Sequence, residues 1–377
     1  MYQVLDSYQR FDQKNNMLYR NRWDPSQQSQ WSLRHQSQLK HMEQGIPGFG
    51  LEDFALANAC GVLATTLGTG INRPNSGLTS WQPLPPDMFF KFPEQKPAVT
   101  DASKMTKRIK RVARYLGADL AGIANLDLRW MYSHYYMPET GERKPVEIEK
   151  RYKYVISMAV EMDYQIYNTT PSTAQMAHVF HSYSKMAFLV AAMAQFIRQL
   201  GYHAIPSLND TGLNIPIAVD AGLGQLGRLG VLITPQFGPR QRLCKVITDL
   251  PLQPDHPIDF GVTEFCSVCR KCAIECPAQA ISYEEPTAEG LTISNNPGVR
   301  KWHLNPEKCD WYGAYTGTNC GICLRVCPFN KSRAWIHNMS RWLIQRAPSV
   351  NALMVRMDDL LGYGKQSDPK LFWSTDV

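Results

Sequence analysis

The chain has 377 residues, 44% of them hydrophobic and 19% charged, with a formal net charge of +7 at pH 7. This length allows two or three structural units, and the composition, which includes no low-complexity tract, excludes a small disulfide-stapled protein. Because Lys and Arg are scattered along the sequence, the positive charge favours solubility or an acidic partner, and we predict no nucleic acid partner.

Residues 1–100 are polar and turn-rich and predict a mostly helical N-terminal unit. The strongest helical pattern runs over residues 51–67, where apolar residues recur at helical spacing. Residues 1–24 contain no basic region followed by an apolar one, so we expect no signal peptide in the chain as given. No apolar run approaches the length needed to span a bilayer.

Residues 101–260 show a regular alternation of helices and strands. A helix over residues 105–116 ends at Gly117, and a long amphipathic helix over residues 176–200 ends at Gly201. Apolar runs predict strands at residues 120–123, 152–162, 202–205 and 230–234. This alternation predicts an α/β unit in which helices pack on a mixed sheet.

The stretch Gly222-Leu-Gly224-Gln-Leu-Gly227 matches G-x-G-x-x-G, which binds dinucleotides when it follows a strand and opens a helix. Residues 220–221 do not predict a strand, and Asp249 is the only acidic residue near the distance that a ribose contact requires. The pattern therefore indicates a dinucleotide only weakly. Two interpretations stay open: the glycines let the backbone approach a large flat ligand, or they only form turns.

Eight of the ten cysteines fall into two patterns within residues 261–332. The first is C-x2-C-x2-C-x3-C-P, and the second is a looser copy with a long first gap. These spacings are typical of two [4Fe–4S] clusters and predict a unit like a bacterial two-cluster ferredoxin. A disulfide scaffold does not suit so long a chain, and structural zinc favours pairs of C-x2-C knuckles.

In two-cluster ferredoxins, the cysteine before proline binds the cluster of the other motif. On this crossover, the first cluster is predicted to be bound by Cys266, Cys269, Cys272 and Cys327. The second is predicted to be bound by Cys276, Cys309, Cys320 and Cys323. Cys60 and Cys244 lie outside both patterns and are predicted to be small buried residues. The C-terminal segment, residues 333–377, is predicted to complete the α/β core, with a cap over the clusters as the alternative.

Two clusters in one chain form an electron wire, which needs a redox centre at its end. The sequence shows no flavin signature and no C-x-x-C-H haem site. A corrinoid held by backbone and shape would leave little motif. No histidine has an aspartate two residues before it, so the D-x-H-x-x-G motif, whose histidine ligates cobalt in some corrinoid proteins, is absent.

Several blocks between residues 101 and 332 resemble the catalytic subunit of respiratory reductive dehalogenases. They follow the family's order and lead into the two cluster motifs. The blocks are Gly117-Ala-Asp-Leu-Ala-Gly122, Arg129-Trp-Met-Tyr-Ser133, Glu161-Met-Asp-Tyr164, His181-Ser-Tyr-Ser-Lys185, Leu200-Gly-Tyr202, Asn209-Asp-Thr-Gly212, Ala221-Gly-Leu-Gly224 with Gly227-Arg228, Leu232-Ile-Thr234, Phe237-Gly-Pro-Arg240 and Thr248-Asp-Leu-Pro-Leu252.

The resemblance implies a nitroreductase-like α/β core that binds a base-off cobamide with no histidine ligand. Electrons would pass through the two [4Fe–4S] clusters to cobalt, which would reduce a carbon–halogen bond, and a proton would replace the halide. The residues implied as cobamide contacts are Gly222, Gly224, Gly227, Asn209 and Thr234.

By position, Tyr183 matches the family's proton donor, Arg242 the cation beside it and Asn209 a polar group of the pocket. An arginine nearby favours the phenolate form of a tyrosine, and a dry pocket strengthens the pairing. Tyr183 would therefore donate the proton, and Arg242 would stabilise the phenolate. Without the resemblance, Tyr183 would be interpreted as a packed core tyrosine and Arg242 as a surface ion pair.

The chain departs from the family pattern in two places. Residues 134–151 are short where many relatives carry an insertion, so one wall of the substrate channel differs. Gly313 stands where some relatives have tryptophan, which reshapes the pocket and prevents a substrate from being assigned by analogy.

Two other functions stay open from the sequence. An epoxyqueuosine reductase, a cobamide and double-cluster enzyme acting on tRNA, would carry an aspartate in place of Tyr183, a basic face for tRNA and usually a helical-repeat tail. A non-catalytic two-cluster electron carrier would not need the large α/β core.

The resemblance also implies the surroundings of the protein. Its substrate would be a small organohalide, and its partners a small membrane-anchor protein and a quinol- or hydrogenase-linked electron donor, with a homodimer left open. The family is exported folded through a twin-arginine leader, which the chain as given lacks. We therefore expect a peripheral protein on the outer face of the cytoplasmic membrane, with the cytoplasm as the alternative.

Overall fold

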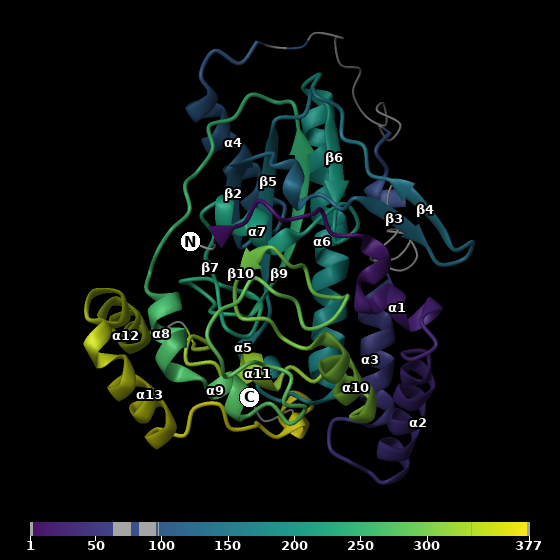
Figure 1. Cartoon of the computed structure of the whole chain (residues 1–377), viewed down its shortest axis with the longest axis vertical. Coiled ribbons are helices and arrows are strands. Elements are labelled where there is room, and N and C mark those ends of the chain that lie inside the picture. Colours follow the sequence, from purple (N-terminus) through teal and green to yellow (C-terminus); the bar gives the residue numbers. More distant parts are fainter. Residues whose placement is uncertain (1–2, 63–76, 83–95, 97, 333, 375–377) are drawn as a thin grey trace.

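The computed structural model describes residues 3–62, 77–82, 96, 98–332 and 334–374 (Figure 1). At its centre is a four-stranded sheet. The strands, in spatial order, are β2 (Leu120–Asn125), β5 (Tyr154–Glu161), β9 (Gln241–Thr248) and β6 (Ala204–Ser207). All neighbouring strands run antiparallel, so the predicted mixed sheet is wrong, although the α/β content agrees with the prediction.

The strand β9, which is absent from the predicted strands, explains this difference. The chain from β5 through a long helix to β6 does give two strands of the same direction, as the alternation implies. However, β9 lies between them and runs the opposite way. The polar residues Gln241, Arg242 and Lys245 interrupt the apolar pattern of β9, so the hydrophobic pattern does not predict this strand.

Short ribbons lie outside the main sheet. The strand predicted at residues 230–234 is β8 (Leu232–Ile233), which pairs with β7 (Gln225–Leu226). A hairpin of β3 (His134–Met137) and β4 (Glu142–Pro145) follows β2. The prediction at residues 230–234 is therefore right about a strand and wrong about its sheet.

Helices cover both faces of the sheet (Figure 1). On one face, α6 (Thr173–Gln199) and α4 (Ala102–Tyr115) enclose the main core with apolar residues of β5 and β9, and Cys244 is buried among them. On the other face, α7 (Asn214–Asp220) packs against β2, β5 and β9. The sheet is thus buried between helices of opposite faces, and alternate residues of β9 point to different layers.

The N-terminal residues form helices that pack on the rest of the chain. α3 (Leu51–Val62) runs along α6, and α2 (Ser29–Glu43) runs along a helix of the cysteine-rich unit. Two elements precede α2 in the chain. They are β1 (Gln3–Val4), which pairs with β10 (Val299–Arg300), and α1 (Met17–Trp23). The part of the predicted helix that follows residue 62 lies outside the described residues.

Short helices build the cysteine-rich unit. They are α8 (Val262–Cys269), α9 (Lys271–Ile274), α10 (Pro306–Tyr315) and α11 (Ile322–Arg325). The four-residue α5 (Tyr164–Tyr167) of the α/β core lies beside this unit (Figure 1). The core and the unit therefore meet along α5 and the loop that follows it.

The C-terminal helices pack on the cysteine-rich unit. Apolar residues of α12 (Trp335–Arg346) and α13 (Asn351–Leu360) join the buried cluster around α8. The buried carboxylate of Asp358 pairs with Lys271 at 2.6 Å and with Lys331 at 2.5 Å. Helices α12 and α13 therefore cap this unit, which is the alternative expected for the segment, whereas the residues that follow them return to the α/β core, where the Ser367 N–H donates to the Asn168 carbonyl oxygen at 2.9 Å. Within the described ranges, none of the helices is both long enough and apolar enough to cross a membrane.

Candidate cluster sites and candidate active site

Four cysteines surround a small cavity in the cysteine-rich unit. Cys266 and Cys269 lie in α8, Cys272 lies in α9 and Cys327 follows α11. All four are buried and line the same cavity. Burial raises the pKa of Cys266 to about 11 and the pKa of Cys269 to about 12. Four buried sulfurs around one space fit the ligand set of a [4Fe–4S] cluster.

The remaining four cysteines of the motifs form a second group. Cys276 follows α9, Cys309 lies in α10, Cys320 precedes α11 and Cys323 lies in it. Burial, and then the charges of the neighbouring thiolates, raise the pKa of Cys323 well above its ordinary value. The structure thus assembles the same two groups as the crossover pairing, and iron binding by each group stays a prediction.

The four cysteines of the first group line a cavity. Among the described residues, no three His, Cys, Asp or Glu side chains converge where a single metal ion would fit. In a cubane each thiolate binds a different iron atom, so the four sulfurs stand around the cluster.

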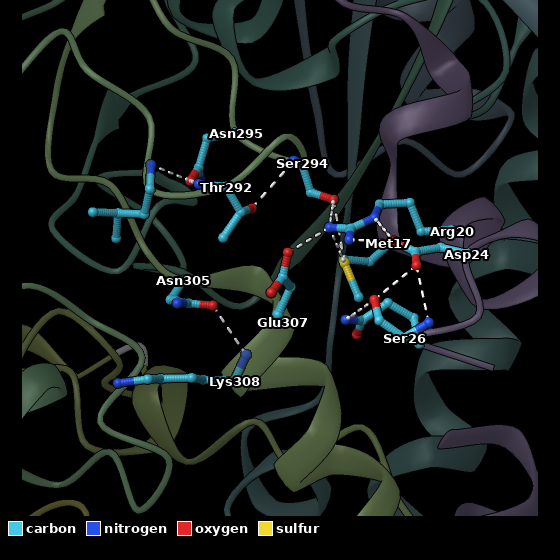
Figure 2. Close-up of polar contacts among 12 residues, drawn as sticks. Met17, Arg20, Asp24, Ser26, Thr292, Ser294, Asn295, Asn305, Glu307 and Lys308 are labelled. Atoms are coloured by element: carbon cyan, nitrogen blue, oxygen red, sulfur yellow. Dashed lines mark hydrogen bonds and ion pairs between the residues drawn. The ribbon is translucent and has the colours of Figure 1, made fainter. Parts of the chain in front are cut away.

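A buried arginine holds the helix that carries Cys309 (Figure 2). Arg20 of α1 is only 4% exposed. Its guanidinium pairs with Asp24 at 2.5 Å and with Glu307, in the first turn of α10, at 2.6 Å. The side chain of Asn305 caps the same turn by accepting a hydrogen bond from a backbone N–H at 3.0 Å. The N-terminal unit therefore fixes the start of α10 and, through it, the position of Cys309.

The three predicted catalytic residues come together between α6, β6 and β9. Tyr183 lies in α6, Asn209 follows β6 and Arg242 lies in β9. The Asn209 amide nitrogen donates a hydrogen bond to the Tyr183 hydroxyl oxygen at 2.8 Å. The Arg242 guanidinium carbon lies 5.5 Å from the centre of the Tyr183 ring. The arginine thus lies beside Tyr183 and makes a cation–π contact with its ring, and its predicted stabilisation of the phenolate stays a prediction.

Two residues that the sequence analysis missed continue from Asn209. Asn214 of α7 donates from Nδ2 to the Asn209 side-chain oxygen at 2.8 Å. Lys245 of β9 donates from Nζ to the Asn214 side-chain oxygen at 2.7 Å. Lys245 is completely buried. A lysine in the middle of an apolar strand segment is the signal that could have found this network, because a buried charge needs partners.

Tyr167 of α5 connects these residues with the second cysteine group. Burial raises the pKa of its phenol well above the ordinary value, and the charges of Arg242 and of Cys323 also act on this hydroxyl. Tyr183 and Leu324 of α11 pack against the same buried cluster, which contains Tyr167. The second cysteine group is therefore in contact with the layer that holds Tyr183.

Some of the buried polar atoms without a partner lie where the α/β core meets the cysteine-rich unit. They include Thr173 Oγ1, Arg240 Nε, Arg242 Nε, Arg325 Nε and Asn330 Oδ1, which have no hydrogen-bond partner among the described residues. Hydrogen bonds from Arg325 to the Thr170 carbonyl and from Arg240 to the Lys331 carbonyl cross the same junction. Such orphaned atoms indicate a further polar ligand or water. The junction therefore fits the amide-rich periphery of a cobamide.

The glycines and the threonine predicted to contact a cobamide have roles within the chain itself. A Cβ added at Gly222 or Gly224 would lie within 2.5 Å of a carbonyl oxygen of another segment, and one at Gly227 would lie 2.5 Å from a side-chain carbon of Ile233. The Thr234 hydroxyl accepts a hydrogen bond from a backbone N–H of its own turn at 3.1 Å. Turn and packing chemistry accounts for these residues, and cobamide contact at them stays a prediction.

A cleft of about 690 Å³ lies along another side of α6. His178, His181 and Lys185 line it. Since a helix turns about 100° per residue, Tyr183 points away from this side. Burial lowers the pKa of His178 to about 4, and its Nε2 accepts a hydrogen bond from the Asp163 N–H at 2.7 Å. The cleft also holds paired groups, such as Arg240 and Glu161 at 3.2 Å. We expect the chemistry at Tyr183 because Asn209 and Arg242, the two residues predicted with it, both contact it.

Comparison with known proteins gives matches to the cysteine-rich unit and to most of the chain. Residues 265–330 match the family model of a 4Fe-4S double cluster binding domain. The tetrachloroethene reductive dehalogenase of Sulfurospirillum multivorans is 39% identical over 306 residues, which are 74% of this chain and 61% of that protein. The enzyme of the same name from Dehalobacter restrictus is 40% identical over 307 residues, 71% of this chain and 55% of that protein. The chain thus spans 55% to 61% of the length of these curated relatives.

Solved structures give the same result. A reductive dehalogenase described in connection with B12-dependent dehalogenation matches with a TM-score of 0.77 at 25% identity, over 99% of this chain and 49% of that one. The catabolic reductive dehalogenase NpRdhA, in complex with 3-bromo-4-hydroxybenzoic acid, matches with a TM-score of 0.74 at 25% identity, over 99% and 49%. An epoxyqueuosine reductase of Lactococcus garvieae is 30% identical, but over only 32% of this chain and 34% of that protein. The resemblance predicted from the motifs is therefore confirmed.

Proposed function

We propose that this chain, as a relative of the reductive dehalogenase catalytic subunits, replaces the carbon–halogen bond of a small organohalide by a carbon–hydrogen bond. The reaction consumes two electrons and one proton and releases a halide ion. The observation that carries the proposal is the hydrogen-bonded Tyr183, held beside Arg242 and in contact with the layer of the second cysteine group. A phenol poised at the end of a cluster chain supplies the proton where the electrons arrive.

The cysteines would hold two [4Fe–4S] clusters in the crossover pairing. Cys327 joins the three ligands of the first motif, and Cys276 joins those of the second. The orphaned polar atoms at the junction, including Arg242 Nε, would hold the periphery of a cobamide. When bound, a cobamide supplies a low-valent cobalt centre that can reduce a carbon–halogen bond.

The two clusters would act in a fixed order. The second cysteine group is in contact with the layer that holds Tyr183, through Tyr167 and Leu324. The first group is enclosed by α8 and the C-terminal helices, on the outer side of the unit (Figure 1). Electrons would therefore enter at the first cluster and reach the reacting site from the second.

Tyr183 would donate the proton, and its neighbours would stabilise the phenolate left behind. Its oxygen accepts the Asn209 N–H, so the phenolic O–H is free to point at a substrate. The charge of Arg242 over the ring favours the anion, and both contacts strengthen as charge develops on the oxygen. Arg242 also keeps water from one side of the ring by packing against it.

Two observations support this function over the alternatives. An epoxyqueuosine reductase would carry an aspartate where this chain has Tyr183, and the alignment with such an enzyme covers only 32% of the chain. A simple electron carrier would have no use for the hydrogen-bond network that ends at Tyr183. The membrane-anchor protein, the quinol- or hydrogenase-linked donor and the outer face of the cytoplasmic membrane are proposals that rest on the family resemblance alone.

The test is anaerobic reconstitution of the full chain with iron, sulfide and a corrinoid. We expect about eight iron atoms and about one cobalt per chain, and chloride release from tetrachloroethene with a reduced low-potential dye as the electron source. Iron without cobalt would favour the electron carrier. Full loading of both cofactors without release of halide from any of a panel of aliphatic and aromatic organohalides would refute the proposal.

A further inference from the structure

Tyr183 stands at one end of a chain of side chains that begins at a buried cation. Lys245 Nζ donates to the Asn214 side-chain oxygen at 2.7 Å, Asn214 Nδ2 donates to the Asn209 side-chain oxygen at 2.8 Å, and Asn209 Nδ2 donates to the Tyr183 oxygen at 2.8 Å. Every donor points the same way. This series of hydrogen bonds starts in β9, continues through α7 and the loop after β6, and ends in α6.

The direction follows from the lysine and from the backbone carbonyl oxygens that accept from Asn214. An ammonium group has three donors and no acceptor. Lys245 finds three acceptors, which are the Asn214 side-chain oxygen and the carbonyl oxygens of Gly212 at 3.1 Å and Leu208 at 3.3 Å. Asn214 therefore turns its oxygen to Lys245, and its NH2 group donates to the Leu208 and Leu243 carbonyl oxygens at 2.8 and 3.1 Å and to the Asn209 side-chain oxygen at 2.8 Å. By the same step, Asn209 must turn its NH2 group to Tyr183.

The surroundings keep this cation charged although it is buried. Asp210 is buried beside the network and Cys244 precedes the lysine in β9, and these are the titratable groups whose charges act on Lys245. Burial lowers the pKa of Lys245 to about 8, against the opposing effect of Asp210. At neutral pH the lysine is therefore mostly protonated, and it loses its charge in the mildly alkaline range.

We propose that Lys245 is a positioning residue for the proton donor. Together with the carbonyl oxygens of Leu208 and Leu243, its charge fixes the orientation of Asn214 and through it Asn209, so that the Tyr183 oxygen accepts a hydrogen bond and its O–H stays available for the substrate. The same aligned chain stabilises the phenolate as the proton leaves, because each bond polarises the next. The inference rests on the proposed function only for the reaction, and not for the orientation of Tyr183.

The orientation can be tested without a corrinoid. The Raman doublet of tyrosine reports whether the phenol oxygen accepts a hydrogen bond, and the difference between each protein and its Tyr183→Phe form isolates this residue. In cluster-loaded protein we expect Lys245→Met to lose the acceptor signature of Tyr183. Lys301→Met is the matched control, since burial also lowers the pKa of Lys301 to about 8 but Lys301 lies in the cysteine-rich unit. The control should keep the signature.

Asn214→Leu tests the same chain with the Lys245 charge and Asp210 intact, which guards against a Lys245→Met protein that fails to fold. It should lose the acceptor signature as well. If either variant folds and retains it, the inference is wrong. Should Tyr183→Phe keep full activity while both variants lose the signature, the orientation stands and only the proposed proton donor fails.

The reconstituted enzyme gives a second readout. We expect Asn214→Leu to lower kcat by about 10- to 100-fold with KM nearly unchanged, as for an interaction made in the transition state. Wild-type kcat should fall above about pH 8 as Lys245 loses its proton. The pKa of Lys245 is about 8 in the folded protein and 10.5 in the unfolded chain, so between these pH values the unfolded chain binds more protons. The contribution of Lys245 to the free energy of unfolding therefore rises with pH, and the fall in kcat does not reflect unfolding caused by this residue. An alkaline limb that persists in Asn214→Leu would contradict the inference.

Discussion

The change Tyr183→Phe removes one hydroxyl group and little else. The ring stays packed in the core between α6 and the sheet, and the cation–π contact with Arg242 is kept. The loss is the 2.8 Å hydrogen bond from Asn209, whose NH2 group is left with one acceptor fewer in a half-buried site. A hydrogen bond of this kind contributes about 1 kcal/mol to stability. The variant should therefore fold and load its cofactors normally.

The loss of activity should be much larger than the loss of stability. A positioned proton donor contributes about 10²- to 10⁴-fold to a rate, which corresponds to about 3 to 5 kcal/mol of activation free energy. This difference between the two effects is what separates a proton donor from a packed tyrosine. A packed tyrosine would show a small change in both quantities.

The assay measures halide release under anaerobic conditions, together with iron and cobalt content and urea unfolding of the same samples. Tyr8→Phe is the matched control, because the Tyr8 hydroxyl donates to the Arg129 carbonyl at 2.9 Å and lies away from the network of Tyr183. The control should lose a similar amount of stability and no activity. A Tyr183→Phe enzyme that is fully loaded and fully active would refute the assignment.

Two further predictions concern the cysteine-rich unit. Cys276→Ser should lower the iron content from about eight to about four atoms per chain and remove the spectrum of the second cluster, while loss of the first would contradict the crossover pairing. Asp358→Asn should destabilise the unit by about 3 to 5 kcal/mol in urea unfolding, because it leaves Lys271 and Lys331 buried without their shared carboxylate. The exposed Asp359, which also pairs with Lys271, is the control, and Asp359→Asn should cost under about 1 kcal/mol.

The two cysteine groups could be predicted from the sequence because the ligand spacing is itself the geometry. Three cysteines separated by two residues each fit one tight turn around a cluster, and the cysteine before proline leaves that turn. No long-range packing is needed to place these cysteines, whereas Cys309 depends on the contact of α10 with Arg20 of the N-terminal unit. The capping by the C-terminal helices could not be predicted in this way, since it depends on where Asp358 meets the lysines of other segments.

The meeting of Tyr183, Asn209 and Arg242 was predicted only through the family resemblance. Each residue alone has a more ordinary interpretation, and their contact depends on α6, β6 and β9 lying side by side. At Gly222 and Gly224, carbonyl oxygens of other segments occupy the space that a side chain would need. The need for glycine there follows from packing between segments, which a local pattern does not show.

β9 explains both the failure of the sheet prediction and the origin of the site. A buried strand is normally apolar, and each polar residue in it requires a partner in the layer that it faces. Residues 242 and 245 are an odd number apart, so Arg242 faces α6 and Lys245 faces α7. Arg242 of this strand therefore contacts the Tyr183 ring directly, and Lys245 is connected to the Tyr183 hydroxyl by hydrogen bonds through two asparagines. Arg242 and Lys245 interrupt the apolar pattern that would have predicted the strand, and in the proposed mechanism the same two charges stabilise the phenolate of Tyr183.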